Sequence, residues 1–196
     1  IVVGHRLGAQ IALHLAVSHP QRVRALALID PIVRKALLGR PRRLRRLEPL
    51  VKIAILILRM LNGLGLRRRR FPLMDLEALD AETREAMRGD HPQEFLVRRY
   101  TGTGLILEYM PIANYLQQLV ASISPLPELE RISVPTLVLE STGVEVMDRD
   151  LSRVELARLP ALERAEINAT HWPLTERPDE VRRAVESWVE RLGPAA

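Results

Sequence analysis

The chain has 196 residues, of which 47% are hydrophobic and 27% are charged. This length is enough for one domain with its own hydrophobic core and one inserted segment. It contains no cysteine, which excludes disulfides and a thiolate zinc site and fits a reducing, cytoplasmic location. The net charge is +5 but aromatic residues are 4% of the chain, so nucleic-acid binding through Arg-rich segments with stacking aromatics is not expected.

The first eight residues, Ile-Val-Val-Gly-His-Arg-Leu-Gly, are the most informative segment. Residues 1–3 are apolar without alternation, which predicts a buried strand of a parallel sheet. A Gly-x-x-x-Gly turn and an Ala-rich helix follow, an order typical of a nucleophile elbow, where two glycines make room for closely passing backbone. The middle position should hold Ser, Cys or Asp, but it holds Arg6, whose protonated guanidinium cannot attack an electrophile.

The elbow is followed by a helix over residues 10–18 and a second buried strand over residues 23–29, which ends at Asp30 and Pro31. Strand, helix and strand within thirty residues predict a βαβ unit and a parallel sheet. The elements of this first segment therefore place Arg6 and Asp30 at the ends of neighbouring strands.

From residue 33 to about residue 124 the pattern is helical, and its first half is strongly basic. Residues 50–61 are almost wholly aliphatic except for Lys52 and Arg59, which are about two helical turns apart and so share one face. We expect the remaining apolar faces of this helix to pack inward and to line or border a pocket. Further helices are predicted over residues 76–87, with Asp75 as N-cap, and over residues 105–123.

The βαβ pattern returns at Pro135. It predicts a strand over 136–139, a helix over 150–158, a short strand over 164–167 and a closing helix over 179–192. These elements together predict an α/β fold for the whole chain. Its core is a mostly parallel sheet from residues 1–32 and 126–196, and an all-helical cap, or lid over the elbow, is inserted at residues 33–125.

Three motifs in this order resemble the α/β-hydrolase fold superfamily from its nucleophile strand to its C-terminus. Residues 4–10, Gly-His-Arg-Leu-Gly-Ala-Gln, resemble the family's Gly-His-Ser-Leu-Gly-Gly elbow. Residues 134–139, Val-Pro-Thr-Leu-Val-Leu, resemble the strand that follows the cap, and residues 170–181 resemble the His loop with its Gly-His-x-x-x-x-Glu-x-Pro pattern. The resemblance implies a partial α/β-hydrolase sheet, and we expect the family's first strands to precede Ile1.

The resemblance implies a nucleophile, a histidine base, an acid that orients it and two amides for the oxyanion. Position 6 is the nucleophile position, and three interpretations of Arg6 stay open. The chain is a degenerate, non-hydrolytic member; or Arg6 is a sequence error or recent loss, since serine and arginine codons differ by one base; or another residue attacks, with Ser141 and Thr170 the nearest candidates by motif.

His171 matches the family's base, the alternative being a loop histidine that caps the last helix. For the acid, the usual position after the strand is Val144, which cannot accept a hydrogen bond. We favour Asp30 at the end of the preceding strand. Glu145 or Asp148, with Asp150 nearby, and the absence of a functional acid are the alternatives.

The backbone amide of Leu7 matches one oxyanion-hole donor, and the second is expected ahead of Ile1. His5 belongs to the elbow, and His14 and His19 are interpreted as structural. No two histidines have ligand spacing supported by carboxylates, so neither a metal nor a cofactor is expected.

Two functions follow from the resemblance. The first is hydrolysis of an ester, amide, thioester or similar bond in a small apolar substrate, with Arg6 making the chain inactive as written. The second is a non-catalytic protein that binds a small ligand, where Arg6 at a helix N-terminus would suit a carboxylate. Residues 34–70 either contact an anionic membrane surface weakly, in a salt-dependent way, or form a packed cap helix with solvated arginines. Within this segment, residues 50–66 are too short and too charged to be expected to span a membrane.

Overall fold

The computed structural model describes residues 1–66, 68, 70–89, 94–96, 99, 103–143, 147–170 and 172–193. The chain divides into two compact units, one of residues 1–46 with 121–196 and one of residues 47–120. The first contains every strand of the described part, and the second is helical. The second unit is narrower than the 33–125 segment expected as a cap.

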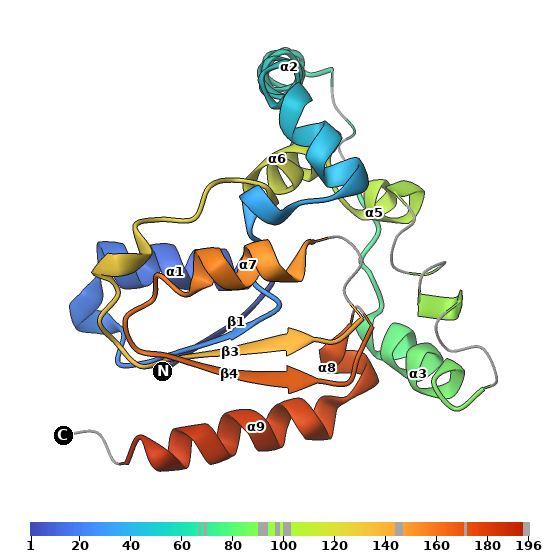
Figure 1. The fold of residues 1–196 in the computed structure, drawn as a ribbon. Helices are drawn as coiled ribbons and strands as arrows, with labels where there is room; N and C mark the ends of the chain where they lie inside the picture. The colour runs from blue at the N-terminus through green and yellow to red at the C-terminus, as the bar shows by residue number, and fades with distance from the viewer. Residues whose placement is uncertain are drawn as a thin grey trace. The chain divides into compact units, whose positions relative to one another are not determined.

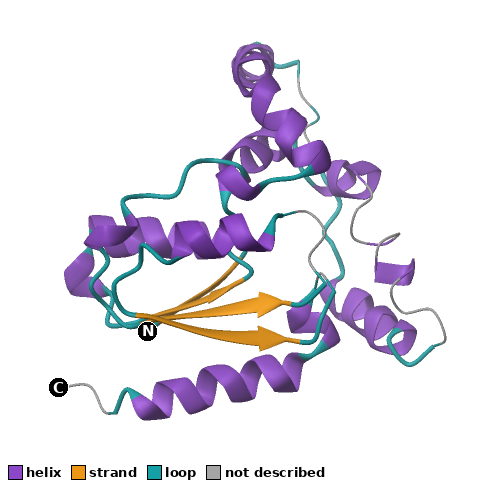
Figure 2. Ribbon diagram, viewed as in Figure 1, coloured by secondary structure: helices purple, strands orange, loops and turns teal. Residues whose placement is uncertain are grey.

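The first unit is built on one sheet of four parallel strands in chain order, β1 (Val2–His5), β2 (Leu26–Ile29), β3 (Thr136–Ser141) and β4 (Leu162–Ile167) (Figure 2). The expected strands are thus present and parallel. β2 begins later than residue 23, because a 3-10 turn at Pro20–Arg22 and a bend at Arg24 precede it.

Helices cover both faces of this sheet, with α1 (Leu7–Ser18) and α7 (Arg149–Leu156) on one side and α9 (Pro178–Arg191) on the other (Figure 1). The side chains of β2 alternate between two buried clusters. Leu26 and Leu28 pack in the cluster that contains α1, and Ala27 and Ile29 pack with Trp188 of α9. Burial on both faces explains why β2 and β3 read as continuous apolar runs. The expectation of a buried strand over residues 1–3 is wrong, because Ile1 and Val3 are 47% and 54% exposed.

The named helices in the described part of this segment are α2 (Gly39–Gly63), α3 (Leu76–Ala86), α5 (Thr103–Tyr109) and α6 (Ile112–Ser122). The expectation that the apolar faces of α2 pack inward is wrong for the side chains that are more than half exposed, which are Leu50, Ile53, Leu56, Ile57 and Met60. Asp75 caps α3 as expected, since its Oδ1 accepts a hydrogen bond from the Ala78 amide at 2.9 Å. The single helix expected over 105–123 is two helices. Pro111 separates them, because a proline lacks the amide proton and disfavours helical backbone at the residue before it.

Among the described residues between Asp30 and Pro135 no strand occurs, and the one departure from helix and loop is an isolated bridge between Leu37 and Met147. Across the described ranges, no helix combines the length and the apolar character that crossing a membrane requires.

Candidate active site

The turn at Arg6 has the geometry of a nucleophile elbow. Arg6 lies between β1 and α1 with φ 50° and ψ −109°, a conformation that L-residues rarely adopt. Its amide donates to the carbonyl of Ile29 at 2.9 Å, which ties the turn to the end of β2. The strained backbone persists although the side chain has no nucleophilic atom.

This turn requires glycine at position 4. A Cβ built at Gly4 would lie 2.4 Å from the Gly8 carbonyl oxygen and 2.7 Å from the Ala9 nitrogen, both backbone atoms. At Gly8 a built Cβ meets no described atom within 4 Å. The expectation that both glycines make room for close backbone is therefore right for Gly4 and wrong for Gly8 within the described part.

The elbow side chains lie in a polar, half-buried environment. Burial lowers the pKa of the Arg6 guanidinium, and the Asp30 carboxylate opposes that shift. Burial also lowers the pKa of His5 below its usual 6.5, the Arg6 charge lowers it further and Asp30 raises it. His5 Nε2 is buried, and no described residue offers it a hydrogen bond. His5 is thereby favoured in its neutral form beside a cationic arginine.

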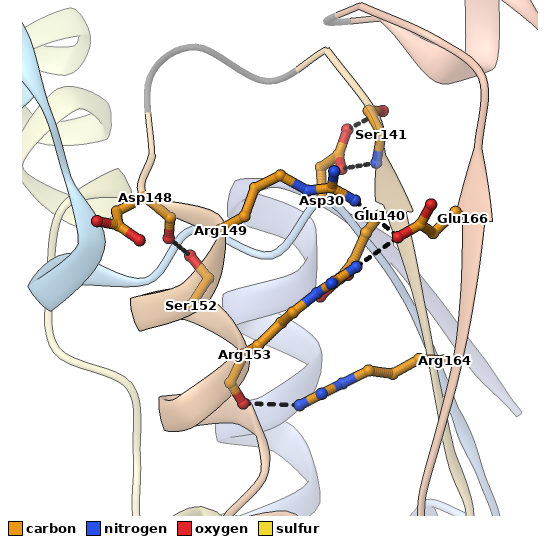
Figure 3. A network of polar contacts seen from close by, with 9 residues as sticks. All are labelled: Asp30, Glu140, Ser141, Asp148, Arg149, Ser152, Arg153, Arg164 and Glu166. Atoms are coloured by element: carbon orange, nitrogen blue, oxygen red, sulfur yellow. Dashed lines mark hydrogen bonds and ion pairs between the residues drawn. The ribbon is translucent and has the colours of Figure 1, made fainter.

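Asp30 is anchored at the end of β2 (Figure 3). Its Oδ1 accepts from the Ser141 amide at 2.8 Å and its Oδ2 from the Ser141 hydroxyl at 2.6 Å, and both residues are buried. Asp30 has φ 44°, a left-handed conformation that aspartate tolerates better than most residues. The pair joins the carboxyl ends of β2 and β3. The hydroxyl of Ser141, one of the alternative nucleophiles, thus donates its hydrogen bond to the Asp30 carboxylate.

His171, the expected base, lies outside the described residues, as do Val144 and Glu145. The residues on either side of His171 in the chain are held by one carboxylate. Glu176 accepts from the Thr170 amide at 2.9 Å and from the Trp172 amide at 2.8 Å. Its two oxygens also accept from the Thr170 hydroxyl, at 2.9 and 3.0 Å. Glu176 belongs to the His-loop motif, and the sequence alone did not indicate this bracing role.

The loops after β3 and β4 pack directly on each other near that position. The Gly143 amide donates to the Ala169 carbonyl at 3.0 Å, and a Cβ built at Gly143 would lie 2.9 Å from the Thr170 Cα. Glycine at position 143 therefore permits the approach of the two loops that carry the acid and base positions in the family motif.

Asp148, an alternative acid, is the N-cap of α7. Its Oδ1 accepts from the Leu151 amide at 3.0 Å. Asp150 lies in the first turn of the same helix and is exposed. The capping role of Asp148 is a sufficient structural reason for an aspartate at this position.

A charged network beside the site was not predicted. Glu140 and Glu166 face each other across β3 and β4, an arrangement that is unfavourable for like charges. Arg153 bonds both, at 2.7 Å to Glu140 and 2.5 Å to Glu166, and Arg149 bonds Glu166 at 2.9 Å (Figure 3). The hydrogen bond from Arg153, with the charge of Arg149, holds the pKa of Glu166 below its usual range. The two arginines of α7 thus offset the electrostatic repulsion between Glu140 and Glu166.

Two cavities bear on ligand binding. One of about 30 Å³ is lined by residues that include Asp30, Ser141 and Arg149, which is space for little more than a water molecule. A second, of about 1100 Å³, lies within residues 47–120 and is lined by Leu58, Leu66, Phe71, Leu107 and their neighbours. Of the described residues, no three or more His, Asp or Glu side chains group as metal ligands would.

Comparison with known proteins gives a family and a fold. A family model described as Alpha/beta hydrolase family matches residues 1–184. A probable alcohol acetyltransferase of Saccharomyces cerevisiae is 25% identical over 210 residues, which is 97% of this chain and 56% of that protein. The chain therefore spans little more than half the length of this curated relative.

Solved structures are similar in fold. A membrane phospholipase A described as a bacterial virulence factor matches with a TM-score of 0.58 and 24% identity, covering 98% of this chain and 57% of that one. The enol-lactonase of Burkholderia xenovorans LB400 matches with a TM-score of 0.55 and 18% identity, covering 96% and 64%. At this identity the likeness shows the fold.

Proposed function

The chain belongs to the alpha/beta hydrolase family, and on that premise we propose that it derives from a hydrolase of ester, amide or thioester-type bonds in small apolar substrates and is inactive because Arg6 occupies the nucleophile position. The observation that carries the proposal is the backbone at Arg6. A turn with φ 50° keeps the strained elbow geometry while its side chain has nothing to attack with.

Neither alternative hydroxyl replaces the missing nucleophile in this proposal. Ser141 is 2% exposed and donates to Asp30, so a substrate carbonyl could not reach its Oγ without displacing a buried pair. The Thr170 hydroxyl is held by Glu176. Both contacts support structural roles.

We expect no serine-hydrolase turnover from the protein with its own residue 6. The measurement is hydrolysis of p-nitrophenyl acetate and butyrate against buffer, with the His171→Ala variant as control. Turnover above buffer that His171→Ala abolishes would show that another nucleophile operates and would contradict the proposal.

We further propose that Asp30 is the acid that orients His171. Its position at the end of β2, its burial and its fixation by Ser141 support the assignment. In an Arg6→Ser background, Asp30→Asn should lower kcat by about 10⁴-fold, because an amide cannot stabilise the imidazolium that forms. Asp148→Asn, which alters a helix cap, should leave kcat within about twofold. A large loss at Asp148→Asn or Glu145→Gln instead would reassign the acid.

Residues 33–125 would serve as the helical cap of such an enzyme. Support comes from the helices of the described part and from the apolar lining of the larger cavity. The apolar lining suits the cavity between Leu58, Phe71 and Leu107 to the apolar part of a substrate, and we propose it as that place.

The second candidate function is ligand binding without catalysis. Arg6 is half-buried and is the N-cap residue of α1, so its cationic side chain and the first amides of that helix are both suited to binding a carboxylate. Calorimetric binding of a short fatty acid that is lost in Arg6→Gln, with no turnover in Arg6→Ser, would favour this function over the first.

A further inference from the structure

A cavity of about 340 Å³ with a basic lining lies within the first unit. It is formed by the 3-10 turn Arg34–Ala36, the first two turns of α2, the loop at residues 125–126 and the end of α7. Cavities of about 300–1,000 Å³ are the usual size for small-molecule sites. This one shares no lining residue with the elbow or with the small cavity beside Asp30.

Positive charge exceeds negative charge around this cavity. Four cationic side chains line it, against the single carboxylate of Glu155. Glu155 bonds Lys35 at 2.8 Å and also bonds Arg158, and the hydrogen bond from Lys35, followed by that from Arg158, holds the pKa of Glu155 below its usual range. Glu130, outside the lining, bonds Arg158 at 2.6 Å. With both carboxylates counted, the cations are still in excess, which favours an anionic ligand.

Arg45 lines the cavity without a carboxylate partner among the described residues. Its side chain is half-buried, and its Nη1 donates to the Arg34 carbonyl at 3.2 Å, which is a neutral acceptor. A guanidinium has five N–H donors in a planar fork, so one contact to a carbonyl leaves donors for the oxygens of an anion. Arg34 also lines the cavity, and its Nη1 donates to the Ile123 carbonyl at 3.4 Å.

The turn that carries Arg34 and Lys35 is fixed to the start of α7. The Ala36 carbonyl accepts from the Asp148 amide at 2.8 Å, and the next residue, Leu37, forms a β-bridge with Met147. A ligand therefore meets cations on backbone that is already ordered, which lowers the entropic cost of binding. The Lys35 side chain is 71% exposed, so its ammonium can turn from Glu155 towards a ligand.

The remaining lining is apolar, and it comes from Val33, Pro125 and Leu126. A ligand that fills this space carries an organic part as well as an anionic group. Several cations favour a phosphate monoester over a carboxylate, because the phosphate has a charge of about −1.5 to −2 at neutral pH and three acceptor oxygens.

We propose that this cavity binds a small organic phosphate ester, with Arg45 and Lys35 on the phosphate oxygens and Leu126 beside the organic part. The site uses no residue of the elbow. It therefore stands or falls independently of the proposed reaction.

The first experiment is a calorimetric titration with phenyl phosphate. Arg45→Gln should weaken binding about tenfold or more, which is the usual worth of a charge-assisted hydrogen bond. Arg45→Lys keeps the charge without the fork, so its loss should be smaller. The matched control is Arg42→Gln, one turn earlier on α2, which removes the same charge from an exposed position outside the lining and should change binding less than about twofold.

Glu155→Gln tests the sign of the electrostatic effect. It removes the carboxylate from the lining while Glu130 still holds Arg158. Binding of phenyl phosphate should become about threefold tighter or more, because a negative charge that repels the ligand is lost. If these residues had only a structural role, this variant would bind no better than the parent, and such a result contradicts the proposal.

Three other ligands test the chemical class. Benzoate and inorganic phosphate should each bind more weakly than phenyl phosphate, since the first lacks the second charge and the second lacks the organic part. Vesicles that contain phosphatidic acid present the same phosphate group on a lipid, and we expect no sedimentation with them that depends on Arg45. Such sedimentation would assign the cavity to a lipid headgroup and overturn the choice of a small ester.

The proposal is also overturned by equal losses in Arg45→Gln and Arg42→Gln, by benzoate binding as tightly as phenyl phosphate, or by no binding of phenyl phosphate at millimolar concentration. Circular dichroism and thermal denaturation check that each variant is folded. If Arg45→Gln failed to fold, the effect of Glu155→Gln and the preference of the parent protein for phenyl phosphate over benzoate would still decide the question.

Discussion

Arg6→Ser should raise the hydrolysis of p-nitrophenyl butyrate from the buffer level by about 10⁴-fold or more, because loss of a catalytic triad member typically costs about 10⁴ to 10⁶ in rate. The backbone at residue 6 already has the elbow conformation, with φ 50° and ψ −109°. The new hydroxyl would stand at the N-terminus of α1, on the residue that precedes Leu7. Labelling by a fluorophosphonate probe provides a second readout.

Arg6→Ala is the matched control for that experiment. It removes the same cation from the same strained position but adds no hydroxyl, so it should remain inert to esters and to the probe. A folded Arg6→Ser protein that stays inert to a broad ester panel would show that the site has lost more than its nucleophile.

Gly4→Val should destabilise the protein by about 3 kcal/mol or more, which is at the upper end of the usual cost of overpacking. The added Cβ would lie 2.4 Å from a backbone oxygen of α1, and neither β1 nor α1 can move without disturbing the sheet or its packed helix. Thermal and chemical denaturation measure the loss, and a lower Tm with a matching fall in the denaturation midpoint is expected.

Gly8→Ala is the control that separates crowding from loss of a glycine. Its Cβ meets nothing described within 4 Å, and alanine is the better helix former by about 1 kcal/mol, so this variant should be as stable as the parent or more stable. If Gly8→Ala proved as damaging as Gly4→Val, the close backbone approach would not be what selects glycine at position 4.

Much of the core could be predicted because its signals are local. The apolar runs of β2 and β3 lie between breakers, and Asp75 and Asp148 precede helical patterns that each of them then caps. Pro111 was a visible breaker, yet the apolar periodicity on both sides of it outweighed that signal in the prediction of one helix over 105–123.

The contacts that organise the site are not local and had no comparable signal. The Ser141 hydroxyl meets Asp30 across 111 positions of sequence, and nothing in either segment specifies that pairing. Arg153 likewise lies on the surface of a short helix, where its charge predicts solvation. The structure makes it the shared partner of two glutamates on neighbouring strands. Aliphatic composition also cannot say which face of a helix is covered, which is why the exposed face of α2 was not foreseen.

The polar anchoring at the strand ends has a consequence for how such a site could be lost or regained. Asp30 is fixed by Ser141, and the backbone around position 171 is braced by Glu176. Neither anchor uses an atom of residue 6. If the proposed loss of the nucleophile is right, substitution at the elbow leaves Asp30 and the residues that flank position 171 with their own supports. Restoring a nucleophile would then need a single codon change at position 6.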